Sequence, residues 1–471
     1  MQIISATPLR KWARCLKIRL REQSGGKRGR VVPGIEVLTS ILPDTSEVSN
    51  EGHLVIGGCD VVDLAGEFGT PLYVFDKATL RHKCREYRRE FTERYPDTLV
   101  IYACKAFLNR ALAQIFMQEG LGLDVVSGGE LYIARSVDFP MGKVYFHGNN
   151  KTPSELRLAL DWGVGRIVVD NFHELALLND AAQKAGVSQN ILLRLSPGVD
   201  PHTHELTTTG IIDSKFGFPV VTGQAEAALV RAMSSSGLHP VGLHVHLGSP
   251  IFEIEPYEQA IEVVLRFAAR MRDKHGFELQ EFSPGGGFAI SYTREDSAPS
   301  VAEYAEAISC RLRSLAGEID LALPRLVIEP GRSIVGRAGI ALYSAGAVKD
   351  IPGVRKYVSL DGGMADNIRP ALYDARYEAL VANKMDAEAV EQVTLAGKLC
   401  ESGDVLIKDI ALPRIEPGDT VAILVSGAYC LPMASNYNAA LKPAVVLVSN
   451  GEAHLIQRRE TYDDLIGRDI V

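Results

Sequence analysis

The chain has 471 residues, 46% of them hydrophobic and 23% charged, a composition typical of globular proteins. Its net charge of −8 argues against a nucleic-acid partner, and the absence of an apolar run of 18 residues argues against a membrane span. Seven cysteines without a C-x-x-C pair indicate free thiols, so we expect a cytoplasmic protein without a disulfide framework or a zinc site.

The first 30 residues differ from the rest, because nine of them are Lys or Arg and Glu22 is the sole acidic residue. They contain no long apolar segment, so a secretory signal is not expected. We predict that residues 1–48 form a basic, flexible extension. Two other interpretations of this segment stay open: a transit peptide, which would direct the protein to an organelle such as a plastid, and an over-extended start codon.

The remaining chain divides into three stretches. Residues 49–76 predict short strands around a helix, and we expect them to pack with a C-terminal β domain. Over residues 77–335, apolar runs alternate with amphipathic segments, which indicates parallel strands joined by helices. Eight runs favour a TIM-like (β/α)₈ barrel, although a doubly wound open sheet has the same local pattern. Over residues 336–471 the helical period fades, and runs such as "DTVAILV" predict a mostly-β domain. The eight apolar runs are 99–103, 121–126, 143–147, 166–170, 191–195, 241–246, 279–283 and 325–329.

Several residues at the predicted strand ends suit an anion. A barrel collects its chemistry at the carboxyl ends of its strands. Gly285, Gly286 and Gly287 follow the seventh strand and would let backbone N–H groups approach a ligand closely. Ser249 and Arg332 add a hydroxyl and a guanidinium, so the group predicts a phosphate site. The glycines taken alone also fit a sharp turn, and their spacing is not that of a dinucleotide-binding motif.

A single lysine, Lys105, follows the first strand. Most lysines at strand ends simply reach solvent, but a lysine facing a phosphate site is what pyridoxal phosphate requires. The amine condenses with the aldehyde while the phosphate anchors the other end. Glu329, after the eighth strand, would then pair with the pyridine nitrogen, and His246 would lie flat on the ring.

These side chains also have purely structural interpretations. Glu329 would otherwise form a salt bridge with Arg332 or Arg194, and His246 would be a hydrogen-bonded core residue. We expect His244 to point to the opposite face from His246. No suitably spaced carboxylate accompanies the histidines of this region, so no metal site is expected from His202, His204, His244 and His246.

Seven motifs occur in a fixed order between about residues 50 and 465: "YACKA", "HVHLGS", "GGGF", "EPGRSIVG", "IRPALYDA", "LCESGDVL" and "GAYCLPMASNYN". In this order they resemble the group IV pyridoxal-phosphate-dependent decarboxylases with an alanine-racemase-like barrel, and within them the branch that acts on diaminopimelate. The resemblance implies a bound pyridoxal 5'-phosphate and a homodimer.

The resemblance also implies roles for individual residues. The catalytic set would be Lys105, His246, Glu329 and Cys400. The cofactor-binding set would be Lys105, His246, Ser249, Gly285, Gly286, Gly287, Glu329, Pro330, Gly331, Arg332 and Tyr429. The substrate-binding set would be Arg332, Arg369, Tyr373, Glu401 and Tyr429. Cys400 would donate a proton, and Cys400 with Glu401 would reach the mouth of the partner subunit, so that active sites are shared.

The reaction implied is decarboxylation of meso-2,6-diaminopimelate to L-lysine and CO₂, the last step of lysine biosynthesis. The far end of this substrate needs a cation for its carboxylate and an acid for its ammonium. Arg332 and Arg369 would bind the carboxylate and Glu401 the ammonium, whereas ornithine needs only the acid, so Arg369 is the discriminating residue. A related decarboxylase acting on ornithine, lysine, arginine or a carboxylated polyamine is the alternative. A racemase is disfavoured because an arginine, not an acid such as Glu329, faces the pyridine nitrogen in that family. A partner-binding homologue without activity is disfavoured because the expected catalytic residues are present.

Two segments depart from the family pattern. Pro284 precedes the three glycines, and Cys430-Leu431-Pro432 follows Tyr429 where small or aromatic residues are usual. Both segments adjoin the expected phosphate site, so their effect on phosphate affinity and side-chain specificity stays open.

Overall fold

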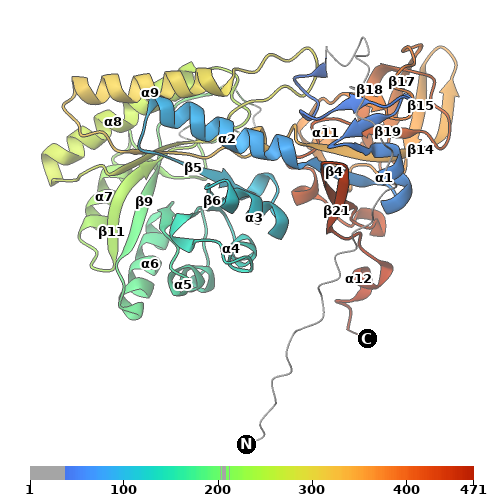
Figure 1. Cartoon of the computed structure of the whole chain (residues 1–471). Coiled ribbons are helices and arrows are strands. Elements are labelled where there is room, and N and C mark those ends of the chain that lie inside the picture. The colour runs from blue at the N-terminus through green and yellow to red at the C-terminus, as the bar shows by residue number, and fades with distance from the viewer. Residues whose placement is uncertain (1–37, 202, 204–207, 212, 471) are drawn as a thin grey trace, which may run out of the picture.

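The computed structural model describes residues 38–201, 203, 208–211 and 213–470. This part of the chain forms a barrel and a β-rich domain beside it (Figure 1). The predicted basic extension lies outside the described residues except for 38–48, and so do His202 and His204. No helix in the described ranges is both long and apolar enough to cross a membrane.

Eight parallel strands close into a barrel within the described residues. The order runs from β5 through β6, β7, β8, β9, β11 and β12 to β13, and β13 pairs back with β5. The predicted barrel is confirmed, and the doubly wound alternative is wrong because β8 pairs with β9 and leaves no open edge. The barrel strands are β5 (Thr98–Ala103), β6 (Gly122–Val125), β7 (Val144–Phe146), β8 (Arg166–Val169), β9 (Gln189–Ser196), β11 (Leu238–His244), β12 (Glu281–Gly285) and β13 (Arg325–Ile328). The two-residue strand β10 (Phe218–Pro219) pairs in parallel with the last residues of β9.

Helices cover the outside of the barrel (Figure 1). They are amphipathic: α8, for example, buries Tyr257, Ile261 and Val264 and ends at Gly276, which adopts a left-handed conformation. The covering helices are α2 (Lys77–Arg94), α3 (Arg110–Gln118), α4 (Gly128–Arg135), α5 (Pro153–Asp161), α6 (Phe172–Ala185), α7 (Gln224–Met233), α8 (Glu255–His275) and α9 (Val301–Glu318).

Side chains fill the interior of the barrel. At its N-terminal end, Glu281 accepts hydrogen bonds from Arg166 and from the Tyr145 hydroxyl, the last at 2.9 Å. With this end closed, ligand chemistry is confined to the opposite end. Above the polar group lies an apolar layer of Ile101, Tyr145, Val168, Leu192, Val241 and Val327.

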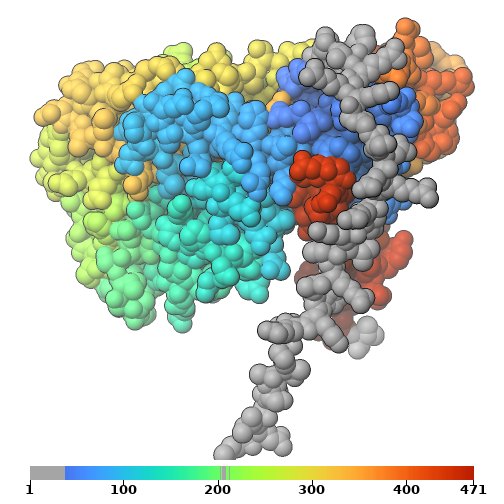
Figure 2. Space-filling model, viewed as in Figure 1, coloured from blue at the N-terminus to red at the C-terminus, as the bar shows by residue number. Residues whose placement is uncertain are grey.

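The β-rich domain combines both ends of the chain. Strand β4 (Leu72–Asp76) lies between β14 (Gly339–Ile351), with which it is antiparallel, and β20 (Ala444–Ser449), with which it is parallel. Figure 1 shows blue β4 and α1 (Val61–Phe68) among the orange and red strands, and Figure 2 shows the same division on the surface. The other elements are β1 (Glu47–Val48), β2 (Leu54–Ile56), β3 (Cys59–Asp60), β15 (Arg355–Leu360), α11 (Arg369–Tyr373), β16 (Ala379–Val381), β17 (Glu391–Ala396), β18 (Val405–Leu412), β19 (Thr420–Ile423), β21 (Glu452–Gln457) and α12 (Tyr462–Ile466).

One buried aspartate joins the two bodies. Asp76 ends β4 and caps helix α2, where its carboxylate accepts a hydrogen bond of 3.0 Å from the Thr79 N–H. Its own N–H donates to the Ala338 carbonyl at 2.8 Å, just where the chain leaves the barrel. The entry to the barrel and the exit from it are therefore fastened together.

A second buried aspartate makes the stability of the β-rich domain depend on pH. Burial raises the pKa of Asp366 to about 6. Hydrogen bonds from Tyr343, Gly363 and Tyr73 favour the ionised form and lower the pKa, but burial has the larger effect. Because the pKa of Asp366 is higher in the folded state than in the unfolded state, its contribution to the free energy of unfolding is fully present below the unfolded-state pKa. That contribution is lost as the pH rises through the folded-state pKa. We expect up to about 3 kcal/mol to be lost between pH 4 and 7.

Urea unfolding of the wild type and Asp366→Asn over this range tests the expectation. The free energy of unfolding of the wild type should fall relative to that of the variant, whose amide does not titrate. Parallel curves would contradict the assignment.

Candidate active site

A small cavity lies at the carboxyl ends of the barrel strands, where the sequence predicts a site. Its walls come from the ends of β5, β6, β12 and β13, from the segment after β11, and from the β-rich domain through Tyr429. The lining residues are Ala103, Lys105, Asp124, His246, Ser249, Gly286, Gly287, Phe288, Glu329, Gly331, Arg332 and Tyr429. Nine of the sequence-predicted site residues therefore meet here. They are Lys105, His246, Ser249, Gly286, Gly287, Glu329, Gly331, Arg332 and Tyr429.

Lys105 lies in a short 3₁₀ turn, Cys104–Ala106, directly after β5. Backbone hydrogen bonds fix this turn, from the Ala103 N–H to the Pro330 carbonyl at 3.0 Å and from the Tyr429 N–H to the Ala106 carbonyl at 2.8 Å. Among the described residues the Lys105 ammonium has no hydrogen-bond or ion-pair partner. It is therefore available to a ligand in the cavity.

The three glycines allow the backbone to approach its neighbours very closely. Gly285 and Gly287 have φ values of +81° and +98°, which disfavour other residues. A Cβ on Gly286 would lie 2.1 Å from the Glu329 carbonyl oxygen, and one on Gly287 would lie 2.4 Å from that of Gly248. Side chains are thus excluded here for reasons of space, and the peptide groups themselves line the cavity.

Glu329 is buried and lies close to one hydroxyl group and two imidazole rings. The Ser283 hydroxyl donates to Oε1 at 2.8 Å, His244 Nε2 lies 3.2 Å from Oε2, and His147 Nε2 lies 3.6 Å from Oε1. Burial alone would raise the pKa of Glu329, but His244, His147 and these hydrogen bonds hold it below the usual value. Glu329 is therefore ionised, which suits a carboxylate that must pair with a cation.

The orientation of His244 corrects a prediction. The prediction is that it points away from the face used by His246, but His244 contacts Glu329, which lines the cavity together with His246. The reason is that side chains two residues apart along a strand share a face, so alternation places His244 on the same side as His246. Nor does Glu329 form the salt bridge to Arg194 or Arg332 that the sequence left open; its partners are the two histidines and Ser283.

Two further residues complete this buried polar group. Burial, and then the charge of Glu329, raise the pKa of Asp124 well above its usual value. Oδ1 of Asp124 and Nε2 of His147 lie 3.6 Å apart, and neither has a hydrogen-bond partner. His147, His244 and Glu329 also bring three ligand-type atoms within 4.8 Å of one another. Because His244 already makes a hydrogen bond to Glu329, we interpret this set as a proton-holding network.

Arg332 forms part of the cavity wall. Its Nε donates to the Ser249 hydroxyl at 3.2 Å and its Nη1 donates to the Tyr292 hydroxyl at 2.7 Å, while the guanidinium lies 4.7 Å from the centre of the Tyr429 ring. Within the described residues no carboxylate pairs with it, although it is only 7% exposed.

Arg369 begins helix α11, just behind this wall. Its guanidinium lies 4.7 Å from the centre of the Tyr292 ring and donates a hydrogen bond to the Tyr377 hydroxyl. It is 6% exposed and, like Arg332, has no carboxylate partner in the described ranges. Tyr373 ends the same helix and is half-buried. Two buried guanidiniums without an anion indicate that the site takes an anionic ligand.

Cys400 and Glu401 are not brought to this cavity. They are exposed, in the loop between β17 and β18. The loop is nevertheless ordered: the Cys400 N–H donates to Asn438 Oδ1 at 2.8 Å, and the Asp404 carboxylate accepts from the Leu399 N–H at 2.8 Å. The predicted proton donor is thus held on the surface, away from the Lys105 of its own chain.

The two departures from the family pattern have local explanations. Pro284, which lacks an N–H, lies where the register between β12 and β13 shifts, between Phe282 and Gly285. Cys430 is buried, with its sulfur 3.6 Å from the Tyr377 hydroxyl. It packs behind the arginines and does not line the cavity.

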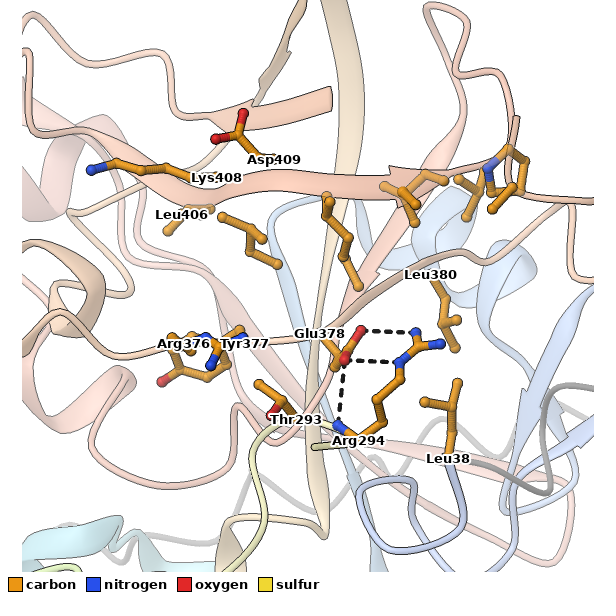
Figure 3. Close-up of a pocket in the computed structure, with 18 of the residues that line it drawn as sticks. Leu38, Thr293, Arg294, Arg376, Tyr377, Glu378, Leu380, Leu406, Lys408 and Asp409 are labelled. Carbon is orange, nitrogen blue, oxygen red and sulfur yellow. Dashed lines mark hydrogen bonds and ion pairs between the residues drawn. The ribbon is translucent and has the colours of Figure 1, made fainter. Parts of the chain in front are cut away.

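A larger cavity, of about 610 Å³, lies in a different place. Figure 3 shows it between the segment Thr293–Arg294, the segment Arg376–Glu378 and strand β18. It has no strand-end lysine and no glycine turn, so it lacks the features of a catalytic centre. Its wall includes Tyr377, the residue that binds Arg369.

Four residues that line the cavity or contact the predicted site residues were not singled out from the sequence: Asp124, His147, Tyr292 and Tyr377. Asp124 had a detectable signal, since a lone acid interrupts the apolar run "LGLDVV". His147 is the last residue of a predicted strand but has no distinguishing neighbour. The two tyrosines lie outside the barrel strands and have no sequence pattern that relates them.

The residues present fit pyridoxal phosphate. A lysine without a partner, an ionised carboxylate and a glycine turn next to Ser249 and Arg332 surround one cavity. Oδ1 of Asp124 and Nε2 of His147 are buried without a hydrogen-bond partner, and a polar ligand would supply one. These features together define a pyridoxal-dependent enzyme.

Comparison with known proteins agrees with this assignment. The family model for the "Pyridoxal-dependent decarboxylase, pyridoxal binding domain" matches residues 77–336. The diaminopimelate decarboxylase of Bacillus subtilis (strain 168) is 47% identical over 91% of this chain and 98% of its own length. The diaminopimelate decarboxylase of M. jannaschii, solved in co-complex with L-lysine, is 37% identical with a TM-score of 0.85, covering 91% of this chain and 98% of that chain. That of Helicobacter pylori, also complexed with L-lysine, is 30% identical with a TM-score of 0.80 over 87% of this chain and 98% of that chain. The chain belongs to the diaminopimelate decarboxylase family of pyridoxal-dependent decarboxylases.

The glycine turn allows a direct test of cofactor binding. In Gly286→Ala the new Cβ meets the Glu329 carbonyl, and the strain of about 1–3 kcal/mol is expected to weaken pyridoxal phosphate binding about tenfold. Gly317→Ala is the matched control, because its Cβ would meet nothing within 4 Å. Titration of cofactor-free protein, followed by absorbance, compares the two. Equal affinities would show that close backbone approach is not what the site requires.

Proposed function

We propose that this chain catalyses the pyridoxal-phosphate-dependent decarboxylation of meso-2,6-diaminopimelate to L-lysine and CO₂. One observation carries the choice of substrate: Arg332 and Arg369 are buried beside the cavity without a carboxylate partner among the described residues. A substrate with a second carboxylate, at the end that does not react, supplies the missing anion. Ornithine lacks such a group and would leave a buried charge uncompensated.

The cofactor supplies an aldehyde that takes up the substrate amino group and a cationic ring that accepts the electrons released when the carboxylate leaves. Lys105 would hold the cofactor through its Nζ. Glu329 keeps a proton on the ring nitrogen, and the hydrogen bonds from Ser283 and His244 support this role because they favour the ionised carboxylate. His246 would lie against the ring.

The remaining residues bind and protonate. The cofactor phosphate is bound by Ser249, the Gly285–Gly287 backbone and Tyr429, with Pro330 and Gly331 forming the adjoining turn. Arg332, Arg369 and Tyr373 bind the distal carboxylate, and Glu401 binds the distal ammonium. After CO₂ leaves, the Cys400 thiol delivers a proton to Cα; a positioned proton transfer of this kind contributes roughly 10²–10⁴-fold to the rate.

The active form is a homodimer with shared active sites. The support is the exposed position of Cys400, which does not line the cavity of its own chain. A second copy is the simplest source of the missing proton donor. We further propose a cytoplasmic location, since every cysteine in the described ranges is a free thiol.

Release of CO₂ from meso-diaminopimelate tests the function. The purified protein, loaded with pyridoxal phosphate, is assayed in parallel on L-ornithine, L-lysine and L-arginine. We expect release from diaminopimelate and at most traces from the others. Release from ornithine with none from diaminopimelate would overturn the proposal.

A further inference from the structure

Two tyrosine rings join the guanidiniums of Arg332 and Arg369. Tyr292 accepts a hydrogen bond from Arg332 through its hydroxyl and presents its ring to Arg369, with 4.7 Å between the guanidinium and the ring centre. Tyr377 accepts a hydrogen bond from Arg369, and its ring meets that of Tyr292 edge-on, with 5.4 Å between centres and 87° between planes. Each arginine is thus fixed by at least one tyrosine, and the tyrosines fix each other.

An ion pair fastens the two segments that carry these rings. Arg294, two residues after Tyr292, donates from Nε and Nη2 to the two carboxylate oxygens of Glu378, each at 3.0 Å. Figure 3 shows this pair with Tyr377 beside it. Arg294 follows β12 of the barrel, whereas Glu378 precedes β16 of the β-rich domain. The unit formed by Tyr292, Arg294, Tyr377 and Glu378, which we name the tyrosine clamp, therefore spans both bodies.

The clamp matters because a guanidinium recognises a carboxylate through a planar fork, which works only at a defined distance and angle. The tyrosines supply ring faces and hydroxyl oxygens but no negative charge. They hold the arginines in place and leave both cations free to meet an anionic ligand. A carboxylate in their position would neutralise them.

We propose that Tyr292 and Tyr377 are specificity-determining positioning residues, which set the spacing of Arg332 and Arg369 so that both meet the carboxylate of the amino-acid centre that does not react. This inference rests on the proposed function. Because L-lysine retains that centre, changes in the tyrosine clamp should weaken the binding of L-lysine as much as that of the substrate. Binding of pyridoxal phosphate, which depends on the opposite side of Arg332 at Ser249, should be little affected.

The experiment uses the cofactor-loaded enzyme and the variants Tyr292→Phe and Tyr377→Phe, which keep the rings and remove one hydroxyl each. We expect the KM for diaminopimelate and the inhibition constant for L-lysine to rise about tenfold, the usual effect of losing a hydrogen bond to a charged group. The kcat should stay within about threefold, and the absorbance spectrum of the bound cofactor should be unchanged.

Two other variants keep the test decisive. Tyr95→Phe is the matched control, a buried tyrosine whose hydroxyl donates to the Pro324 carbonyl far from the site. Arg294→Gln leaves both tyrosines intact and should shift the same two constants by a smaller factor. The clamp is overturned if the wild type decarboxylates diaminopimelate while Tyr292→Phe and Tyr377→Phe match Tyr95→Phe in both constants. A wild type that releases no CO₂ from diaminopimelate overturns the proposed function and the clamp together.

Discussion

Replacing Lys105 by alanine is expected to abolish CO₂ release, with a loss of at least about 10³-fold, because no other amine lines the cavity in the described chain. The turn that carries Lys105 is fixed at both ends by backbone hydrogen bonds, which do not involve the side chain. The variant should therefore fold normally and fail in chemistry. Far-ultraviolet circular dichroism and the steady-state rate of CO₂ release, measured on the same preparation, separate the two effects.

Borohydride reduction identifies the amine directly. In the wild type, reduction followed by peptide mapping should recover pyridoxyl label on the peptide that contains Lys105. Lys143→Ala is the matched control, since Lys143 is exposed and precedes β7, at the other end of the barrel. Label on a different lysine, or an active Lys105→Ala enzyme, would refute the assignment of the site.

Cys400→Ala is expected to lower kcat by roughly 10²–10⁴-fold while the cofactor spectrum stays normal, because the thiol acts only at the protonation step. Cys310→Ala, at the other exposed cysteine, should leave the rate unchanged. A rate for Cys400→Ala within about threefold of the wild type would assign the proton to another group.

Mixing two inactive variants tests whether the active sites are shared. If Cys400 serves the Lys105 of a second copy, mixtures of Lys105→Ala and Cys400→Ala should regain activity. About a quarter of the wild-type rate is expected at equal amounts, since about half of the dimers are mixed and each mixed dimer contains one intact site out of two. If both residues served the same chain, a mixed dimer would contain no intact site and the mixture would stay inactive.

The barrel could be predicted because its information is local. Each buried parallel strand appears in the sequence as an apolar run. The residues that follow each run lie at the carboxyl end of the barrel, where the functional site of this fold is found. Lys105, Glu329 and the three glycines were found in this way. The position of Tyr429 could be assigned only through the family resemblance, since Tyr429 comes from the other domain.

The contacts between distant segments could not be predicted. Tyr292 and Tyr377 become partners only when the segment after β12 meets the segment before β16, and neither segment has a periodic pattern. The orientation of His244 was misjudged for a different reason: side chains two residues apart on a strand share a face, so alternation places His244 beside His246. The charge states of Asp124 and Glu329 likewise depend on burial and on each other, which the order of residues does not reveal.

The central position of β4 has a consequence for synthesis on the ribosome. This strand is translated before the barrel, yet its neighbours β14 and β20 are translated after it. Until the last segment emerges, the nascent chain carries a strand with unpaired edges, the kind of surface that chaperones cover and that aggregation exploits. A gene fragment that starts after the barrel would lack the strand that joins β14 to β20, so we expect it to be insoluble unless residues 47–76 are fused back onto it.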